Sequence, residues 1–290
     1  MSEFDVVVIG SLNMDIVART PRLPGPGETL SGTSYSEFPG GKGLNQAVSA
    51  ARCGARVALI GAVGDDAAGA SLRRVLQDEG IEDRHVLTHD GAATGRAIIA
   101  VDDQAENSII VIPGANSLLR FDTLASAPLL LAQLEVPTSA IEAAFIAAQS
   151  QEMRTLLNPA PAASMSASLL ECCNVVVPNE HEVELIGGVD GLLDAGVDDV
   201  IVTRGAAGAE HHRLGHHTHS VPAFPVDPVD TTGAGDALCG ALAARLASGD
   251  DMATSLRFAA AAGALATTTP GAVPSLPTMA QIMRLIGSHP

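Results

Sequence analysis

A glycine-rich stretch ahead of a predicted helix, VDTTGAGDALCGAL at 229–242, has the residue types that bind an anion and accept a proton. Glycines 233 and 235 leave their backbone N–H groups free to point outward, where the positive end of the helix dipole adds to the attraction for an anion. Asp236 follows in the first turn of that helix. A lone carboxylate at this position most often caps the helix, but beside a phosphate site it can also accept the proton of an attacking hydroxyl.

A second glycine-rich stretch, FPGGKGLNQA at 38–47, contains the only lysine of the chain, since the other 15 of its 16 basic residues are arginines. An ammonium is a compact charge on a flexible stem, whereas an arginine fork is bulkier and planar. Lys42 is therefore a candidate for a cation that must fit close to a ligand. The alternative is that its side chain points into solvent and only its backbone matters.

The two most familiar phosphate-binding signatures are missing from the sequence. There is no G-x-x-x-x-G-K-[ST], and no G-x-G-x-x-G opens a helix after the first apolar run. A P-loop enzyme and an ordinary dinucleotide dehydrogenase are therefore weak candidates.

Short apolar runs alternate with helical runs rich in alanine and leucine. Six continuous apolar runs that end in Gly, Pro, Asn or Glu predict parallel strands buried on both faces, at 5–10, 56–64, 128–135, 155–161, 174–180 and 199–205. Helices are predicted at 43–53, 67–80, 138–149, 234–248, 251–266 and 278–286. This alternation predicts an α/β fold, a doubly wound and mostly parallel sheet with helices on both faces. Ligands bind such sheets beyond the carboxyl ends of the strands.

Two segments interrupt this alternation, at 13–38 and 93–113. Both have the pattern of hairpins, with turn-forming centres PRLPGPGE and DDQAEN. They predict either a small accessory sheet, which would act as a lid, or an extension of the main sheet, and the pattern alone does not choose between the two. Because no linker, low-complexity tract or internal repeat divides the chain, we expect residues 1–290 to form one domain.

Composition excludes several classes of protein. A net charge of −17 repels phosphate backbones and argues against a nucleic-acid partner. The apolar runs are interrupted well before the roughly 18 residues of a membrane span. The start, MSEFDVVVIG, reads as a buried strand rather than a signal peptide, so we expect a cytoplasmic protein. The four cysteines, Cys53, Cys172, Cys173 and Cys239, are expected to be reduced thiols.

Eight motifs recur in order between residues 4 and 277. They are GSLNMD, GGKGLNQA, GAVGDD, QLEVP, NPAP, PNEHEVE, TRGAAG and DTTGAGD. Together they resemble the ribokinase-like, phosphofructokinase-B type family of sugar and nucleoside kinases, and GGKG-x-NQA and SLNMD are the most specific of them. The resemblance implies a single α/β domain with a β-sheet lid, and ATP-dependent transfer of phosphate to a sugar hydroxyl.

The same resemblance assigns roles to individual residues on the sugar side and at the reacting centre. Sugar hydroxyls would be held by Asn13, Asp15, Gly41, Lys42, Asn45 and Glu135. A polyol needs several fixed donors and acceptors, which makes such a set chemically reasonable. Asp236 would be the general base for the primary hydroxyl. The amides of Gly233, Ala234 and Gly235 would bind the phosphoryl group in transit.

On the nucleotide side, Asn179 and Glu182 match an N-x-x-E element that positions Mg²⁺ and the phosphates of ATP. The same two residues also fit a helix capping box, and both roles can hold. The turn beneath the phosphates is matched by Thr203, Gly205 and Gly208. A monovalent cation, typically K⁺, would lie between two loops formed by Asp230, Thr232, Ala266, Thr269, Gly271 and Ser275.

Three stretches depart from the family pattern or stand outside it. GGVDGLLDAGVDD, between Ile186 and Val200, is shorter than the full helix of relatives, which predicts a thinner layer there. Ala260 replaces the Asn or His that relatives often present to the nucleotide base, so purine preference is left open. The histidines of 211–219 are predicted to flank a hairpin turn, with His217 and His219 on one strand face; solvated histidines are the commoner case, and a transition-metal site is the alternative.

The resemblance thus favours phosphorylation of D-ribose to D-ribose 5-phosphate. A nucleoside kinase of the adenosine type, or another pentose or hexose kinase, is the rival within the fold. A sugar-binding protein without catalysis is the rival of another class, although Asp236 and the GAG and N-x-x-E elements argue against it. We also expect a homodimer formed through the lid sheets.

Overall fold

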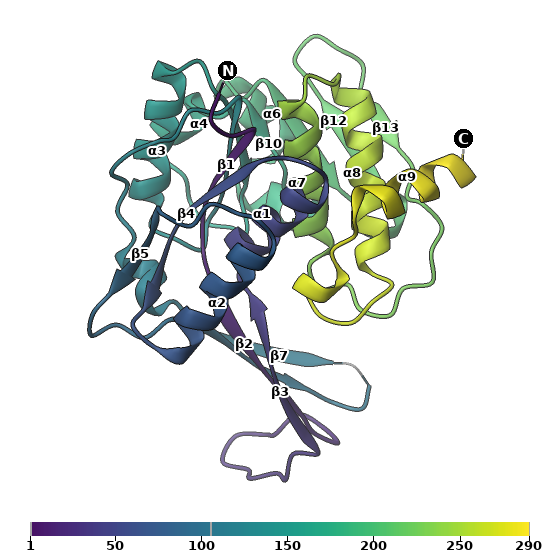
Figure 1. The fold of residues 1–290 in the computed structure, drawn as a ribbon. Coiled ribbons are helices and arrows are strands. Elements are labelled where there is room, and N and C mark those ends of the chain that lie inside the picture. Colours follow the sequence, from purple (N-terminus) through teal and green to yellow (C-terminus); the bar gives the residue numbers. More distant parts are fainter. Residues whose placement is uncertain (1, 105, 290) are drawn as a thin grey trace.

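The computed structural model describes residues 2–104 and 106–289, and its centre is a nine-stranded sheet in the order β13-β12-β11-β10-β9-β8-β1-β4-β5 (Figure 1). Seven of its strands are parallel: β1 (Val6–Ile9), β4 (Val57–Gly64), β5 (Val86–His89), β8 (Leu129–Gln133), β9 (Arg154–Asn158), β10 (Val175–Val176) and β11 (Asp199–Thr203). An antiparallel hairpin, β12 (Ala209–His212) and β13 (His219–Val221), continues one edge. The apolar runs form the central strands because helices cover both faces of these strands, whose side chains are mostly apolar and buried.

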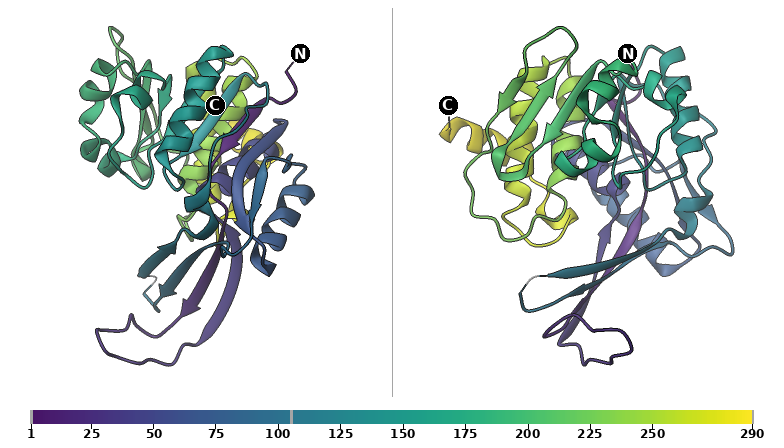
Figure 2. Two further views of the ribbon diagram at one scale, coloured as in Figure 1. Left: turned by 90° about the vertical axis from the view of Figure 1, so that its left-hand side faces the viewer. Right: turned by 180° about the vertical axis from the view of Figure 1, so that it is seen from behind.

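Helices cover both faces of this sheet, as the views in Figure 2 make visible. One layer contains α1 (Lys42–Arg52), α2 (Ala67–Asp78), α7 (Ala234–Ala247), α8 (Met252–Ala266) and α9 (Met279–Ser288). The other contains α3 (Thr138–Ser150), α4 (Ala167–Glu171), α5 (Glu180–Leu185) and α6 (Gly188–Asp194). Each layer packs its own apolar cluster against the sheet. The predicted doubly wound α/β fold is therefore confirmed.

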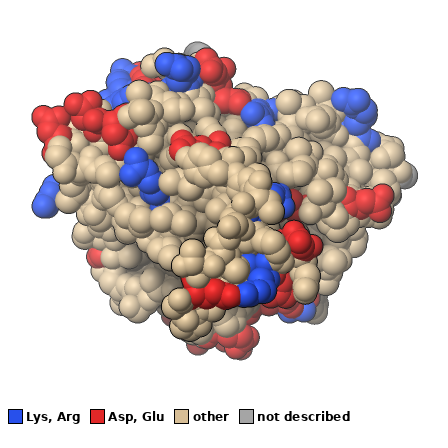
Figure 3. Space-filling view, turned by 90° about the horizontal axis from the view of Figure 1, so that it is seen from below, with Lys and Arg blue, Asp and Glu red and all other residues tan. Residues whose placement is uncertain are grey.

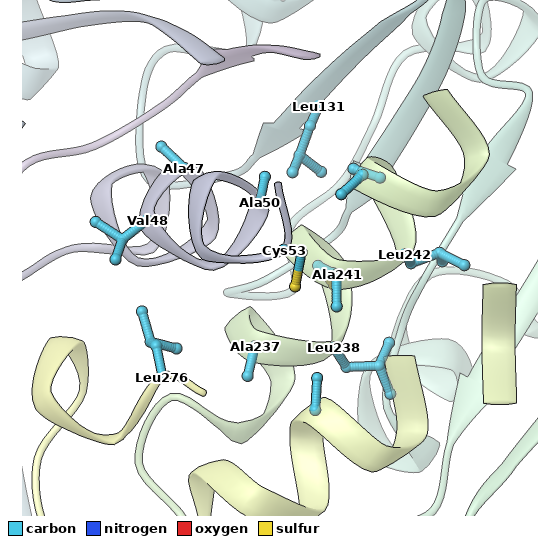
Figure 4. Packing of buried hydrophobic residues seen from close by; sticks show 14 of the residues in the cluster. Ala47, Val48, Ala50, Cys53, Leu131, Ala237, Leu238, Ala241, Leu242 and Leu276 are labelled. Carbon is cyan, nitrogen blue, oxygen red and sulfur yellow. The ribbon is translucent and has the colours of Figure 1, made fainter. Parts of the chain in front are cut away.

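Helices α1 and α7 pack together unusually closely, with alanines and one cysteine between them (Figure 4). A Cβ added at Gly240 would lie 2.4 Å from the backbone oxygen of Gln46, so this position requires glycine. Ser49 Oγ, in the same contact, donates a hydrogen bond to the Ala237 carbonyl at 2.8 Å. The small residues therefore bring the N-terminal turns of both helices within hydrogen-bonding distance of each other.

The two predicted hairpins form a separate four-stranded sheet in the order β3-β2-β6-β7, which we call the lid. Its strands are β2 (Asn13–Arg19), β3 (Ser34–Gly40), β6 (Gly95–Val101) and β7 (Asn107–Ile112), and β2 pairs with β6 in parallel. β2 begins four residues after β1 ends, so the lid projects from the carboxyl-end edge of the main sheet (Figures 1 and 2). The small accessory sheet is therefore confirmed, and the alternative of a longer main sheet is wrong.

The strand predicted at 174–180 is only two residues long, because it ends at a proline and a helix N-cap. Pro178 has no N–H to donate, and Asn179 caps α5. The Val177 carbonyl instead accepts a hydrogen bond from the Asn158 side chain at 2.9 Å. Farther along, the short segment after Ile186 still forms the two-turn helix α6, which buries Leu192 against the sheet.

The placement of the histidines differs from the prediction. β12 ends at His212 and β13 begins at His219, so His217 lies in the connecting loop and shares no strand face with His219. His211 Nε2 pairs with the buried carboxylate of Asp199 at 2.7 Å, and His212 Nε2 lies 3.4 Å from Glu210. Among residues 2–104 and 106–289, no group of three or more His, Cys, Asp or Glu side chains is arranged to hold a metal ion.

The remaining composition-based expectations concern cysteines and membranes. All four cysteines are free and buried. No helix within the described part of the chain combines the length and apolar character that a membrane crossing requires.

Candidate active site

The carboxyl ends of β1, β8, β9 and β11 meet the base of the lid and the N-termini of α1 and α7 at one edge of the main sheet. Among the residues predicted to hold sugar hydroxyls, Asn13 opens β2, and its Oδ1 accepts a hydrogen bond from the buried Asn116 amide at 2.8 Å. Gly40 pairs with Asn13 in the lid, and a Cβ there would lie 2.2 Å from the Asp15 carboxylate. The glycine therefore leaves room for Asp15 to turn into the site.

Gly41 and Glu135 anchor the start of α1. Gly41 caps the helix with φ 91°, a left-handed conformation that favours glycine, and a Cβ there would lie 2.7 Å from the backbone nitrogen of Asn13. Glu135 Oε2, beyond the end of β8, accepts a hydrogen bond from the Lys42 backbone N–H at 3.0 Å and another from the Ser11 hydroxyl. The second oxygen of Glu135 remains available for a ligand.

Asp236 lies in the first turn of α7 but does not cap it, because the N-cap is Gly233 and no side chain closes that end. Its carboxylate is 5% exposed and points across to α1. There, Oδ1 accepts from Gln46 Nε2 and Oδ2 from Asn45 Nδ2, both at 2.9 Å. The capping alternative for Asp236 is therefore wrong.

Lys42 is the first residue of α1, where the helix dipole disfavours a cation. The negative charge of Asp236, with those of Glu135 and Glu182, outweighs the opposing effect of burial and raises the pKa of the lysine above its usual value. The side chain lines a cavity of about 230 Å³ together with Asp236 and Glu182. The alternative that Lys42 points into solvent is therefore wrong.

The same cavity extends to the nucleotide-side candidates Asn179, Glu182, Thr203, Gly233 and Gly235. Asn179 and Glu182 form a complete capping box: Asn179 Oδ1 accepts from the Glu182 N–H at 2.7 Å, and Glu182 Oε2 accepts from the Asn179 N–H at 2.8 Å. Only one carboxylate oxygen of Glu182 is used in this way. The second carboxylate oxygen, Oε1, takes no part in the capping box, so Glu182 can cap α5 and bind a ligand at the same time.

Gly205 and Gly208 shape the turn between β11 and β12. Gly208 has φ 95°, and a Cβ there would lie 2.1 Å from the Val221 carbonyl, so the tight turn depends on glycine. At the start of α7, the Ala234 N–H donates to the Thr231 carbonyl at 3.2 Å. The N–H groups of Gly235 and Asp236 belong to the first helical turn and have no partner within the helix.

Two loops beside this turn are joined by Asp230. Its Oδ1 accepts from the Thr232 N–H at 2.9 Å and its Oδ2 from the Gly271 N–H at 2.8 Å. Burial opposes the charged form, but these amide donors lower the pKa of the Asp230 carboxyl below its usual value. Ala266 is buried at the end of α8, Thr269 lies in the loop that follows, and the Ser275 hydroxyl donates to the Ala272 carbonyl. Of the six residues assigned to a cation, Asp230, Thr232, Thr269 and Gly271 lie in loops, whereas Ala266 ends α8 and Ser275 ends a short 3₁₀ helix.

Several polar residues of the site were missed by sequence reasoning. They are Ser11, Gln46, Asn116, Gln133 and Asn158, of which the first four are completely buried. Four of them lie inside the motifs GSLNMD, GGKGLNQA, QLEVP and NPAP. A polar side chain within an otherwise apolar run is the signal that could have found them, since such a group needs a buried partner.

Comparison with known proteins shows the family of the chain. Residues 3–279 match the family described as pfkB family carbohydrate kinase. The chain is 36% identical to the ribokinase of Haemophilus influenzae over 97% of this chain and 98% of the relative. It is 34% identical to the deoxyribokinase of Salmonella typhi over 96% of this chain and 97% of that protein.

Among solved structures, ribokinase from Arabidopsis thaliana, complexed with ribose and ATP, superimposes with a TM-score of 0.88 at 29% identity. That match covers 97% of this chain and 98% of the plant enzyme. The fold and the site thus define a kinase of the doubly wound α/β class. The chain belongs to the pfkB family of carbohydrate kinases.

We predict that the buried Asp15 carboxylate destabilises the ligand-free protein. Burial, and then the charges of Glu135 and Asp236, raise the pKa of Asp15 to about 7. The unfolded carboxyl has a pKa of about 3.9. The ionised form is therefore penalised only in the folded state, and stability is lost as pH rises from about 4 to about 7.

Asp15→Asn removes this penalty. Its melting temperature should match that of wild type near pH 4, exceed it increasingly up to pH 7, and keep a constant advantage above pH 7. Asp65→Asn, which changes an exposed acid, serves as the control and should follow wild type throughout. Identical melting curves for Asp15→Asn and wild type at pH 8 would contradict the prediction.

Proposed function

We propose that this protein is an ATP-dependent kinase that converts D-ribose to D-ribose 5-phosphate. The observation that carries the proposal is the buried Asp236 carboxylate, which is fixed by Asn45 and Gln46 at the helix N-terminus that borders the Lys42 cavity. A base, anion-binding amides and a cation then surround one point. Similarity to ribokinases over nearly the whole chain supports ribose as the acceptor.

The reaction follows from the placement of these groups. Asn13, Asp15 and Glu135 hold sugar hydroxyls at the base of the lid. Asp236 accepts the proton of the sugar 5-hydroxyl. The oxygen of that hydroxyl attacks the γ-phosphorus of ATP in line, while the bond from the γ-phosphorus to the β-phosphate oxygen breaks and ADP leaves. The free N–H groups at the start of α7 bind the phosphoryl group in transit, where the helix dipole also favours negative charge.

Lys42 supplies a positive charge between the sugar side and the phosphates. It lies among the negative charges of Asp236, Glu135 and Glu182, so an incoming phosphate meets an ammonium that is already placed. A flexible stem allows the charge to follow the transferred group, which the planar fork of an arginine does less well.

Two cations complete the proposed site. Asn179 and Glu182 fit a hydrated Mg²⁺, because the capping box leaves one carboxylate oxygen of Glu182 free beside the cavity. Bound there with ATP, Mg²⁺ would neutralise charge on the phosphates. The loops joined by Asp230 would hold a monovalent cation such as K⁺ through their carbonyl and hydroxyl oxygens. We place the enzyme in the cytoplasm, where its four buried thiols would stay reduced.

Substrate choice separates this proposal from its rivals. We expect a coupled assay to register ADP release with ATP and D-ribose but not with ATP and adenosine. That result would rule out a nucleoside kinase. Because a deoxyribokinase is also among the relatives, 2-deoxyribose belongs on the panel with other pentoses and hexoses. A wild-type protein that is inactive on every sugar would overturn the proposed function.

We predict that Asp236→Asn lowers kcat by at least about 10²-fold, the scale of general-base catalysis, and leaves nucleotide binding nearly intact. Asp251→Asn is the matched control, because Asp251 caps the neighbouring helix α8 through a hydrogen bond with the Thr254 N–H. That variant should lower stability slightly and keep kcat. Retained turnover in Asp236→Asn would remove the base role from this residue.

The single lysine makes its own role testable. Lys42 and the N-terminus are the only aliphatic amines, so an amine-specific reagent should modify two sites, which mass spectrometry can separate. Modification of Lys42 should abolish activity, and ribose together with nucleotide should protect both the residue and the rate. Lys42→Met should lower kcat/KM on the order of 10²-fold, as expected for a lost electrostatic contact. Full activity in Lys42→Arg would contradict the proposal that position 42 requires the compact ammonium of a lysine.

The lid supports a homodimer. β7 is an edge strand of the lid, and its apolar side chains are exposed: Ile109 by 53%, Ile110 by 61%, Val111 by 51% and Ile112 by 44%. From the lid side, broad uncharged areas separate the acidic and basic groups (Figure 3). An exposed apolar edge strand in water favours pairing with another strand, and a second lid can provide that strand.

We predict a dimer in sedimentation velocity that Ile110→Asp converts to a monomer, because a carboxylate in this apolar contact would be desolvated without a partner. Met283→Asp, on the equally exposed surface of α9, should leave the dimer unchanged. A wild-type monomer at all concentrations would contradict the prediction.

A further inference from the structure

A chain of buried side-chain amides connects the Asp236 carboxylate to the backbone of the main sheet. Gln46 Nε2 donates to Asp236 Oδ1 at 2.9 Å and to Asn158 Oδ1 at 3.1 Å. Asn158 Nδ2 donates to the Val177 carbonyl at 2.9 Å. Gln133 Nε2, at the end of β8, donates to Gln46 Oε1 at 2.7 Å. Gln46 and Gln133 are completely inaccessible to solvent, and Asn158 is 8% exposed.

The backbone carbonyl at one end fixes the direction of every bond in this chain. Because the Val177 carbonyl can only accept, Asn158 must present its NH₂ group there and its oxygen to Gln46. Gln46 must then present its own NH₂ group to Asn158, and the second hydrogen of that group points to Asp236. Its oxygen is occupied by the Gln133 amide. The Gln46 side chain therefore has no alternative orientation that keeps its partners satisfied.

The two oxygens of Asp236 consequently differ. Oδ1 faces a donor that cannot turn round, so a proton on Oδ1 would lie against an N–H group. Oδ2 is bound by Asn45 Nδ2, and the Oδ1 atom of Asn45 is buried without a hydrogen-bond partner among the residues that the structure describes. Asn45 therefore has an unused acceptor on the same side-chain amide that contacts Oδ2.

We propose that Gln46 is a positioning residue that holds Asp236 through Oδ1 and thereby makes Oδ2 the atom that accepts the proton. This inference rests on the proposed function. In the reaction, the proton of the 5-hydroxyl moves to Oδ2 as the new O–P bond forms and the bond to ADP breaks. The contact with Asn45 gives way to the substrate, while the contact with Gln46 persists and keeps the carboxylate aimed.

The first test is a comparison of steady-state kinetics. Gln46→Met keeps the side-chain volume and removes the amide, and it should lower kcat by about 10²-fold, as misplacement of a catalytic group does. The KM values for ribose and ATP should stay within about twofold of wild type, because Gln46 contacts neither ligand in the proposed site. Gln46→Asn, which is too short to reach Asp236, should repeat this result if the methionine variant folds poorly.

Ser49→Ala is the matched control. Ser49 is also completely buried on α1 and bonds to α7, but it contacts the Ala237 carbonyl and not the carboxylate. This variant should keep kcat within about threefold of wild type while its melting temperature falls, since it loses one buried hydrogen bond. Equal losses of kcat in the Gln46 and Ser49 variants, or a loss expressed mainly in KM, would overturn the inference.

The second test needs no turnover. In a double-mutant cycle read by melting temperature, the loss caused by Gln46→Met should shrink by at least half in an Asp236→Ala background. An active wild type without this coupling would overturn the inference and keep the proposed function. A wild type inactive on all sugars, but with the coupling, would overturn the proposed function and keep the contact between Gln46 and Asp236.

Discussion

The close packing of α1 on α7 is the constraint on which the site depends. Gln46 and Asp236 are 190 positions apart in the chain, and only this helix pair brings them together. Glycine at 240 and the alanines of both helices remove the side-chain volume that would otherwise hold the helices apart (Figure 4). The geometry of the candidate site is thus set by small residues, which carry no polar side chains themselves but let the polar residues of the two helices come into contact.

Several acidic side chains lie close together at the same edge of the sheet, although like charges repel each other. The charges of Asp236, Glu135 and Glu182 raise the pKa of Lys42, whereas the pKa of Asp15 is raised first by burial and then by the charges of Glu135 and Asp236. Two helix N-termini add fixed positive ends to the same region. Such an arrangement favours a ligand that offers hydroxyl donors to the carboxylates and phosphate oxygens to the cation.

Local sequence patterns were sufficient for the elements but not for the contacts between them. Apolar runs and helical periodicity predicted the central strands and most helices, because a strand that is buried on both faces is a continuous run of apolar residues. Alternation alone did not separate the lid from the main sheet, since alternating strands look the same in either sheet, and only the family resemblance predicted a lid. The resemblance likewise predicted a role for Asp236 beyond capping, but the partners of Asp236 and Gln46 depended on contacts between distant segments. His217 was misplaced because turn length, not alternation, decided where β12 ended.

Amide side chains suit the second layer of this site for a physical reason. A charged neighbour at Oδ1 would bring another charge into a buried place, and an apolar neighbour would leave Oδ1 there without a donor. An amide donates a hydrogen bond without adding charge. Because it has a donor group and an acceptor oxygen, its orientation also fixes the orientation of the next amide in the chain of hydrogen bonds. In this protein the requirement ends at the Val177 carbonyl, a group that cannot rotate or change its proton count. The orientation of the Asp236 carboxylate is thereby fixed, through Gln46 and Asn158, by a backbone carbonyl directly after β10.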